Sequence, residues 1–152
     1  MIAIKPHHFV DIITVFGDGR TSDEPHPFGH ALHLVSREVL GNRDVQLRME
    51  LGADDICAPC RHNINGLCDD VIDTSYRPDA PKSKREWNLI IDLRWCGRLG
   101  IKQDDRMAAR QLCEIIRERA GDITDIYREI PAARTAERQA KLAKGLMTYL
   151  AG

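Results

Sequence analysis

Apolar residues recur at intervals of three or four along most of this 152-residue chain, which predicts a mainly helical fold. Pro6 opens the first such segment and a Gly-Asp-Gly sequence follows it, so we expect a helix over residues 6–16. A second helix is expected from Pro27 to about residue 40. Further helices are predicted over residues 83–98, 104–119 and 132–150, with a shorter one near 122–129.

A strand pattern is found in a smaller part of the chain. Apolar and polar residues alternate over residues 45–51, which predicts a strand with one buried face. In residues 1–5, larger apolar residues lie on both sides of the small residue Ala3. The length is typical of one domain. We therefore expect an α+β fold, a mainly helical single domain over residues 1–152 with one or two short strands.

Residues 52–81 form an irregular segment that is rich in Asp, Asn, Pro and Cys. A loop of this length inside a compact domain is normally functional or disordered. A bound metal is one way to order such a loop where apolar burial cannot. We therefore expect a metal-organised central loop that packs against the helices.

Three cysteines in this loop form the most specific pattern of the chain. Cys57 and Cys60 form a C-x-x-C pair, and Cys68 follows after seven more residues. A C-x-x-C pair lets two thiolates converge on one ion from a tight turn. Thiolates select zinc or an iron-sulfur cluster over calcium or magnesium, which prefer oxygen ligands. The three cysteines are thus candidate metal ligands.

A fourth ligand is expected from another part of the chain. We favour Cys96, because it directly precedes Gly97, where a turn would expose its sulfur. Cys113 lies on an apolar helical face, which is the setting of a buried core thiol. His62 and the histidines near the N-terminus are the remaining alternatives.

The cysteine spacing favours a 4Fe-4S cluster held by Cys57, Cys60, Cys68 and Cys96. Zinc ribbons use two C-x-x-C pairs, whereas this chain has one pair and single cysteines. A cuboid cluster accepts thiolates from unrelated elements. We predict an iron-sulfur protein that transfers electrons or performs cluster-dependent catalysis on a small substrate. The alternative is zinc, in a structural module that binds a protein or nucleic acid.

Two histidines and an aspartate near the N-terminus supply a second kind of chemistry. His7, His8 and Asp11 lie on the first predicted helix, with His7 and Asp11 one turn apart on the same face. A carboxylate so placed can hold the tautomer and orientation of an imidazole. We expect the three residues to face the metal as catalytic groups. Capping of the helix or hydrogen bonding to the nearby loop is the alternative.

Two motifs together resemble those of a small family of bacterial and archaeal proteins of unknown function, in which iron-sulfur or other metal binding is suspected. The motifs are Lys5-Pro6-His7-His8 and the segment D-D-I-C-x-P-C-x-H-N, from Asp54 to Asn63, with Cys68 after Gly66. The similarity covers about residues 2–119. It implies a cysteine-bound metal centre approached by the paired histidines. Family members often have cysteine in place of Asp11 and further cysteines near the C-terminus.

Composition and charge argue against nucleic acid and membranes as partners. Lys plus Arg number 22 against 23 Asp plus Glu, so the net charge of -1 gives no general attraction to nucleic acid or anionic lipid. Aromatic residues make up 5%, too few for a platform that stacks bases. With no membrane-spanning or signal pattern, we expect a cytoplasmic protein. Its expected partner is a small-molecule substrate or a redox protein, and the last helix offers an apolar face for a homodimer.

Overall fold

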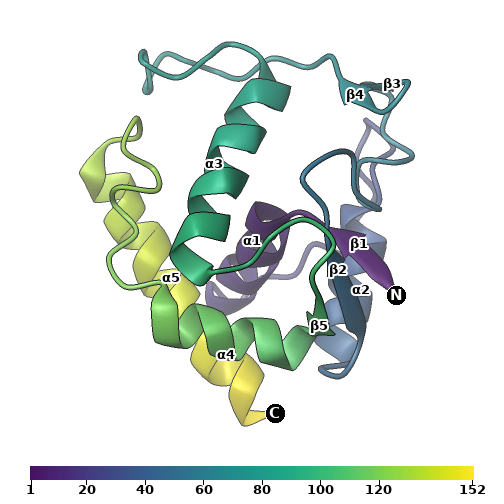
Figure 1. Cartoon of the computed structure of the whole chain (residues 1–152), viewed down its shortest axis with the longest axis vertical. Helices are drawn as coiled ribbons and strands as arrows, with labels where there is room; N and C mark the ends of the chain where they lie inside the picture. Colours follow the sequence, from purple (N-terminus) through teal and green to yellow (C-terminus); the bar gives the residue numbers. More distant parts are fainter.

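The computed structural model describes all 152 residues and has a mainly helical α+β fold (Figure 1). No helix combines the length and the apolar character needed to cross a membrane. The elements, in chain order, are β1 (Ile2–Ile4), α1 (Pro6–Gly17), α2 (Leu32–Gly41), β2 (Gln46–Met49), β3 (Asn63–Ile64), β4 (Leu67–Cys68), α3 (Lys84–Leu99), β5 (Arg106–Ala108), α4 (Ala109–Arg119) and α5 (Ala132–Ala151).

A three-stranded sheet fixes the start of the chain. Its central strand, β2, pairs in parallel with β1 and antiparallel with β5. Ile4 lies opposite Met49, and Leu47 lies opposite Met107. Ile4, Leu47 and Met49 are fully buried and join the core. Because β1 leads into α1 at Pro6, the sheet determines where the first helix begins and where its two histidines lie.

Helix α1 packs against both α3 and α5. Its residues Phe9, Val10, Ile12 and Ile13 are almost completely buried. Ser83 begins α3 by accepting a hydrogen bond from the backbone N–H of Glu86, which satisfies one of the free donors at the helix start. The first turn of α1 and the N-terminal half of α3 contribute residues to the same cavity.

The Cys-rich segment is irregular, as predicted, apart from the short hairpin formed by β3 and β4. Asn65 and Gly66 both have positive φ, at 54° and 86°, as a two-residue hairpin turn requires. Figure 1 shows the chain after β4 running across the N-terminal end of α3 before it enters that helix. The hairpin and this crossing segment therefore cover one end of the helical part of the molecule.

Helix α2 begins at Leu32, although the sequence pattern predicts a start at Pro27. Gly29 has a φ of 75°, a left-handed conformation that a right-handed helix does not contain. The backbone of the intervening residues bonds the Cys-rich segment instead. Ala31 donates its N–H to the carbonyl oxygen of Ile56, and Arg61 donates to Phe28.

Two further predictions of helix are wrong for a tertiary reason. Residues 106–108 of the segment expected to be helical form β5, because the edge of β2 supplies hydrogen-bond partners. The segment 122–129 is not a helix either, and its residues 124–129 form turns. There, Arg98 donates to the carbonyl oxygen of Asp122, and Arg94 donates to that of Ile126. Side chains of α3 thus bind carbonyl groups of this segment.

Two glycines bring the backbones of α1 and α5 into contact. A Cβ added at Gly145 would overlap the carbonyl oxygen of Ile13, and a Cβ added at Gly17 would overlap that of Lys141. A backbone carbonyl cannot rotate away as a flexible side chain can. The close approach of the two helices therefore depends on the lack of a side chain at both positions.

We expect Gly145→Ala to destabilise the protein by at least about 2 kcal/mol, because the clash separates α1 from α5 and exceeds the gain in helix propensity. Gly97→Ala is the matched control, since Gly97 is exposed on α3 and its added Cβ would meet nothing within 4 Å. The control should stabilise the protein by up to about 1 kcal/mol. Urea unfolding measures both, and equal effects of the two substitutions would contradict this account of the helix crossing.

Candidate metal centre

A cavity of about 500 Å³ lies between the start of α1, the Cys-rich segment and the first half of α3. Six of the seven residues that the sequence predicts as site residues line this cavity; they are His7, His8, Asp11, Cys57, Cys60 and Cys68. The structure thus brings together the two motifs, which are about fifty residues apart in the sequence.

Asp54 is the carboxylate that holds His8 in place. His8 donates its Nδ1 hydrogen to Oδ2 of Asp54, with the two atoms 2.7 Å apart. The Asp54 side chain is fully buried, whereas His8 retains some exposure. Since Nδ1 carries the donated hydrogen, Nε2 of His8 is the nitrogen left to accept a proton or bind a metal.

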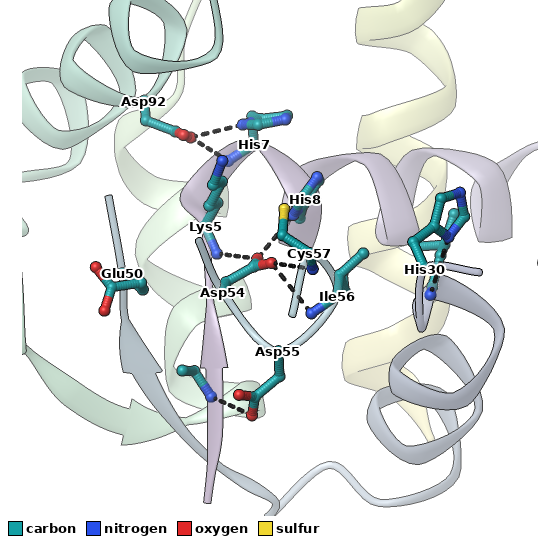
Figure 2. A network of polar contacts seen from close by, with 12 residues as sticks. Lys5, His7, His8, His30, Glu50, Asp54, Asp55, Ile56, Cys57 and Asp92 are labelled. Carbon is teal, nitrogen blue, oxygen red and sulfur yellow. Dashed lines mark hydrogen bonds and ion pairs between the residues drawn. The ribbon is translucent and has the colours of Figure 1, made fainter. Parts of the chain in front are cut away.

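The oxygens of Asp54 are fully used by the protein itself. Oδ2 also accepts the backbone N–H of Lys5 at 2.8 Å, and Oδ1 accepts those of Ile56 and Cys57 at 3.1 Å and 3.0 Å (Figure 2). His8, Asp54 and Cys57 each have one possible ligand atom, and these three atoms lie within 4.8 Å of one another. The three residues could therefore bind one ion. However, a carboxylate that already accepts four hydrogen bonds has few lone pairs left for a metal. We therefore assign Asp54 an orienting role.

A second carboxylate, Asp92 of α3, holds His7 in the same way. Its Oδ1 accepts both the backbone N–H of His7 and the Nδ1 hydrogen, each at 2.8 Å. Figure 2 shows Asp92 reaching from α3 to the start of α1, above Lys5 in this view, whereas Asp54 lies below Lys5. The Oδ2 atom of Asp92 is buried and has no hydrogen-bond partner. His7, like His8, is left with Nε2 as its free nitrogen.

A third histidine on the cavity wall, His62, follows the same arrangement. Its Nδ1 lies 2.7 Å from Oδ1 of Asp69, within the hairpin region. Its Nε2 is buried and has no partner, and neither has Oδ1 of the adjacent Asn63. Native proteins pair the great majority of buried polar atoms. These two atoms are therefore available to a ligand or to an ordered water.

The expected pairing of His7 with Asp11 is not formed. Asp11 lines the cavity, but its carboxylate lies 3.4 Å from an Nη of Arg138 on α5, and its side chain is 46% exposed. The sequence argument expected Asp11 to hold the imidazole of His7 in its tautomer and orientation. Since solvent and Arg138 both stabilise its charge, that argument is wrong, and the histidines take their carboxylates from other elements.

Cys57, Cys60 and Cys68 are free thiols and are half-buried at the cavity. Burial, with the nearby charge of Asp54, raises the pKa of the Cys57 thiol to about 12. This thiol is therefore protonated at neutral pH in the protein alone. A metal ion that binds it would displace the proton.

Cys96 does not line the cavity. The helix continues through Gly97 to Leu99 and is followed by Gly100, which has a φ of 70°, so the expected turn after Cys96 does not occur. Cys96 is 8% exposed and packs in the hydrophobic core, where burial raises its pKa to about 11. Cys113 is fully buried in the same core, as the sequence pattern predicts.

The two neighbouring histidines should titrate on opposite sides of pH 6.5, the ordinary imidazole value. Burial lowers the pKa of His7, but the charge and hydrogen bond of Asp92 outweigh it and the pKa is raised. Burial and the charge of His7 lower the pKa of His8 despite the presence of Asp54. NMR titration of the ring protons, assigned with His7→Gln and His8→Gln, measures both values. The same titration midpoint for both rings would contradict the different effects of Asp92 on His7 and of burial on His8.

Asp54 and Asp55 provide a matched pair of substitutions. Asp54→Ala should cost about 3 kcal/mol or more, because it leaves several buried donors unpaired. Asp55 is exposed and accepts one bond, from Ala3, so Asp55→Ala should cost less than about 1 kcal/mol. Chemical denaturation compares the two variants, and similar losses would show that Asp54 is not the anchor of the Cys-rich segment.

The hydrogen bonds of Asp54 also predict how the stability of the protein depends on pH. Although burial raises the pKa of Asp54, the charge and hydrogen bonds of His8 and the backbone donors outweigh it and hold this pKa well below its usual range. The stabilisation of the folded state by the ionised Asp54 carboxylate is thus present above about pH 4 and is lost as the pH falls further. The difference in stability between wild-type protein and Asp54→Ala should therefore shrink in acid, and a difference that grows in acid would contradict this sign.

Asp92 was not a sequence candidate, because nothing in the local pattern of α3 links it to the N-terminal histidines. Asp54 entered the sequence analysis only as the first residue of the D-D-I-C-x-P-C-x-H-N motif, and nothing in the sequence indicated its orienting role. The completed donor set consists of thiols and imidazole nitrogens, which suit a transition metal and proton transfer. No protein-family model, curated protein or solved structure matches the chain, so this donor set is the basis for assigning a function.

Proposed function

We propose that the protein holds an iron-sulfur cluster on the thiolates of Cys57, Cys60 and Cys68, and that His7 and His8 exchange protons with a small molecule bound beside it. One observation carries this proposal. A single cavity collects three free cysteines and three histidines whose Nδ1 atoms are each bonded to a carboxylate, and these residues come from segments far apart in the chain.

The residues of the Cys-rich segment fit such a group. Soft thiolates on the wall of one cavity favour an iron-sulfur cluster or zinc over hard cations. The segment also leaves the buried atoms His62 Nε2 and Asn63 Oδ1 without partners, although both residues line the cavity. A loop with few buried apolar side chains and unsatisfied polar atoms gains stability when a metal binds, because binding then contributes to folding.

The cluster would be held by three cysteines, since neither Cys96 nor Cys113 lines the cavity. This leaves one coordination position for a ligand other than cysteine. When bound, the group would supply an electron or a Lewis-acidic iron to a molecule in the cavity. The three cysteines of the motif therefore supply the protein ligands, and the fourth ligand expected from Cys96 is not needed.

The two histidines of α1 perform the proton chemistry in this proposal. In each ring, Nδ1 donates to a buried carboxylate oxygen, so the tautomer and the ring orientation are fixed. Nε2 is then the atom that takes a proton from, or gives one to, the bound molecule. Asp92 and Asp54 act as positioning residues, because each acts through a histidine.

A specific observation favours zinc as a second candidate. Ligand atoms of His8 and Cys57 lie within 4.8 Å of each other, which is close enough for the two to share a single ion after a small adjustment. Cys60 and Cys68 do not belong to this group and would have to move toward the ion. The zinc site would then use Cys57, Cys60, Cys68 and His8, a three-cysteine, one-histidine set found in structural zinc sites. In that case His8 is a ligand and cannot exchange protons.

Anaerobic purification followed by metal, acid-labile sulfide and absorption measurements tests the proposal. We expect about four iron atoms and four sulfides per chain, with a brown colour. Cys68→Ser should lose the metal, because it removes a charged ligand from the site. Cys113→Ser is the matched control, and both it and Cys96→Ser should retain the metal.

Other results distinguish the two candidates. A colourless protein with one zinc and no sulfide would replace the cluster with the zinc site, and His8→Ala would then lose the metal. Under the cluster proposal, His8→Ala keeps its iron. Retention of all metal by Cys68→Ser, or the absence of any metal from anaerobically purified protein, would overturn both proposals.

A further inference from the structure

The charged side chains on the cavity wall are mostly cations. Five cations line it against two carboxylates: Lys5, Arg77, Lys84, Arg85 and Arg138 against Asp11 and Asp70. The two carboxylates are already paired. Asp70 lies 3.5 Å from Lys84, and Asp11 lies 3.4 Å from Arg138. Lys5, Arg77 and Arg85 therefore remain on the wall without a carboxylate partner.

Lys5 is the most unusual of these three cations, because it is 5% exposed. It lies between β1 and α1, where its backbone N–H is bound by Asp54 (Figure 2). Its ammonium group forms no ion pair, either with Asp54, which binds His8, or with Asp92, whose Oδ1 binds His7 and whose Oδ2 has no hydrogen-bond partner. Burial of a charge without a partner costs considerable free energy. A bound anion would remove this cost.

Arg77 is a second cation that is prepared for an anion. Its Nε donates to the backbone oxygen of Asp73, and its guanidinium lies 4.7 Å from the ring centre of Tyr76 and 5.2 Å from that of Trp87. These contacts fix the plane of the guanidinium, while its Nη atoms make no hydrogen bond. A guanidinium held in this way presents two parallel donors, the geometry that carboxylate and phosphate accept.

The rest of the wall indicates the body of the ligand. Half of the lining residues, 15 of 30, are hydrophobic, among them Phe28, Leu32, Trp87 and Ile91. The volume of about 500 Å³ is within the range of sites that enclose small molecules. An inorganic ion would leave this apolar surface uncovered, whereas an organic anion would cover it.

We propose that the cavity binds a small organic anion, a carboxylate or a phosphate ester with an apolar body, through the ammonium of Lys5 and the guanidinium of Arg77. The inference rests on the proposed function for the reaction that the ligand undergoes. Binding itself depends on Lys5 and Arg77 and is measurable with or without the metal. The anionic group is therefore the feature by which the site recognises its substrate class.

Titration calorimetry with three aromatic probes of similar shape tests the proposal on the purified protein. Benzoate and phenyl phosphate carry the anionic groups, and benzamide is the neutral counterpart of benzoate. We expect at least one of the anions to bind about 10-fold or more tightly than benzamide, because charged hydrogen bonds add to the affinity. The tighter of the two anions identifies carboxylate or phosphate as the recognised group.

Two substitutions locate the binding. Lys5→Met keeps the apolar stem and removes the charge, and Arg77→Gln removes the guanidinium; each should weaken binding of the preferred anion about 10-fold or more. Lys102→Met and Arg37→Gln are the matched controls, since both residues are exposed and neither lines the cavity. Arg77 is only half-buried, so Arg77→Gln preserves the test if circular dichroism shows that Lys5→Met does not fold.

Equal affinity for benzoate, phenyl phosphate and benzamide, or no binding of any of them at millimolar concentration, would overturn the inference. Anion binding that survives Arg77→Gln and Lys5→Met as well as it survives the controls would also overturn it. The fate of the proposed function is separate. If the protein prefers anions but never holds metal, this inference stands and the cluster proposal is overturned. If the protein holds the metal but shows no preference for anions, the cluster proposal stands and this inference is overturned.

Discussion

The candidate site depends on the buried carboxylate of Asp54. Its two oxygens accept hydrogen bonds from the backbone of Lys5, from the His8 ring and from the backbone of Ile56 and Cys57. One fully buried side chain thus joins the strand-to-helix junction of the N-terminus to the start of the Cys-rich segment. Each of these donors would be costly to bury without a partner. The relative position of the histidines and the first cysteine follows from this network.

The second constraint comes from Asp92, which ties α3 to the start of α1 through His7. With Asp54 it makes the cavity a junction of three parts of the chain. The carboxylates are turned toward the protein, while the free imidazole nitrogens and the thiols remain for a ligand. The buried ammonium of Lys5 has no ion-pair partner and Nε2 of His62 has no hydrogen-bond partner, and both residues lie on this wall. Unpaired buried groups of this kind are expected mainly at functional sites.

Much of the fold is predictable from local pattern because amphipathic helices carry their own periodicity. The segments that became α1, α3 and α5 were predicted to within one or two residues, and the alternation around β2 identified a strand. The segments predicted wrongly are those whose backbone groups bond to distant partners. Residues 106–108 became β5 against β2, and 122–129 formed no helix and is bound by arginines of α3. Local propensity does not contain such contacts.

For the site, the sequence by itself determined the donor atoms: a C-x-x-C pair with a third cysteine, and two histidines at a helix start. Only the tertiary structure decided which carboxylates orient the histidines, because Asp54 and Asp92 are 46 and 85 residues from their partners. It also turned Asp11 toward Arg138 and placed Cys96 in the core, since α3 continues beyond Gly97. Spacing along a chain indicates which side chains share a helix face, whereas burial and long-range hydrogen bonds determine what that face meets.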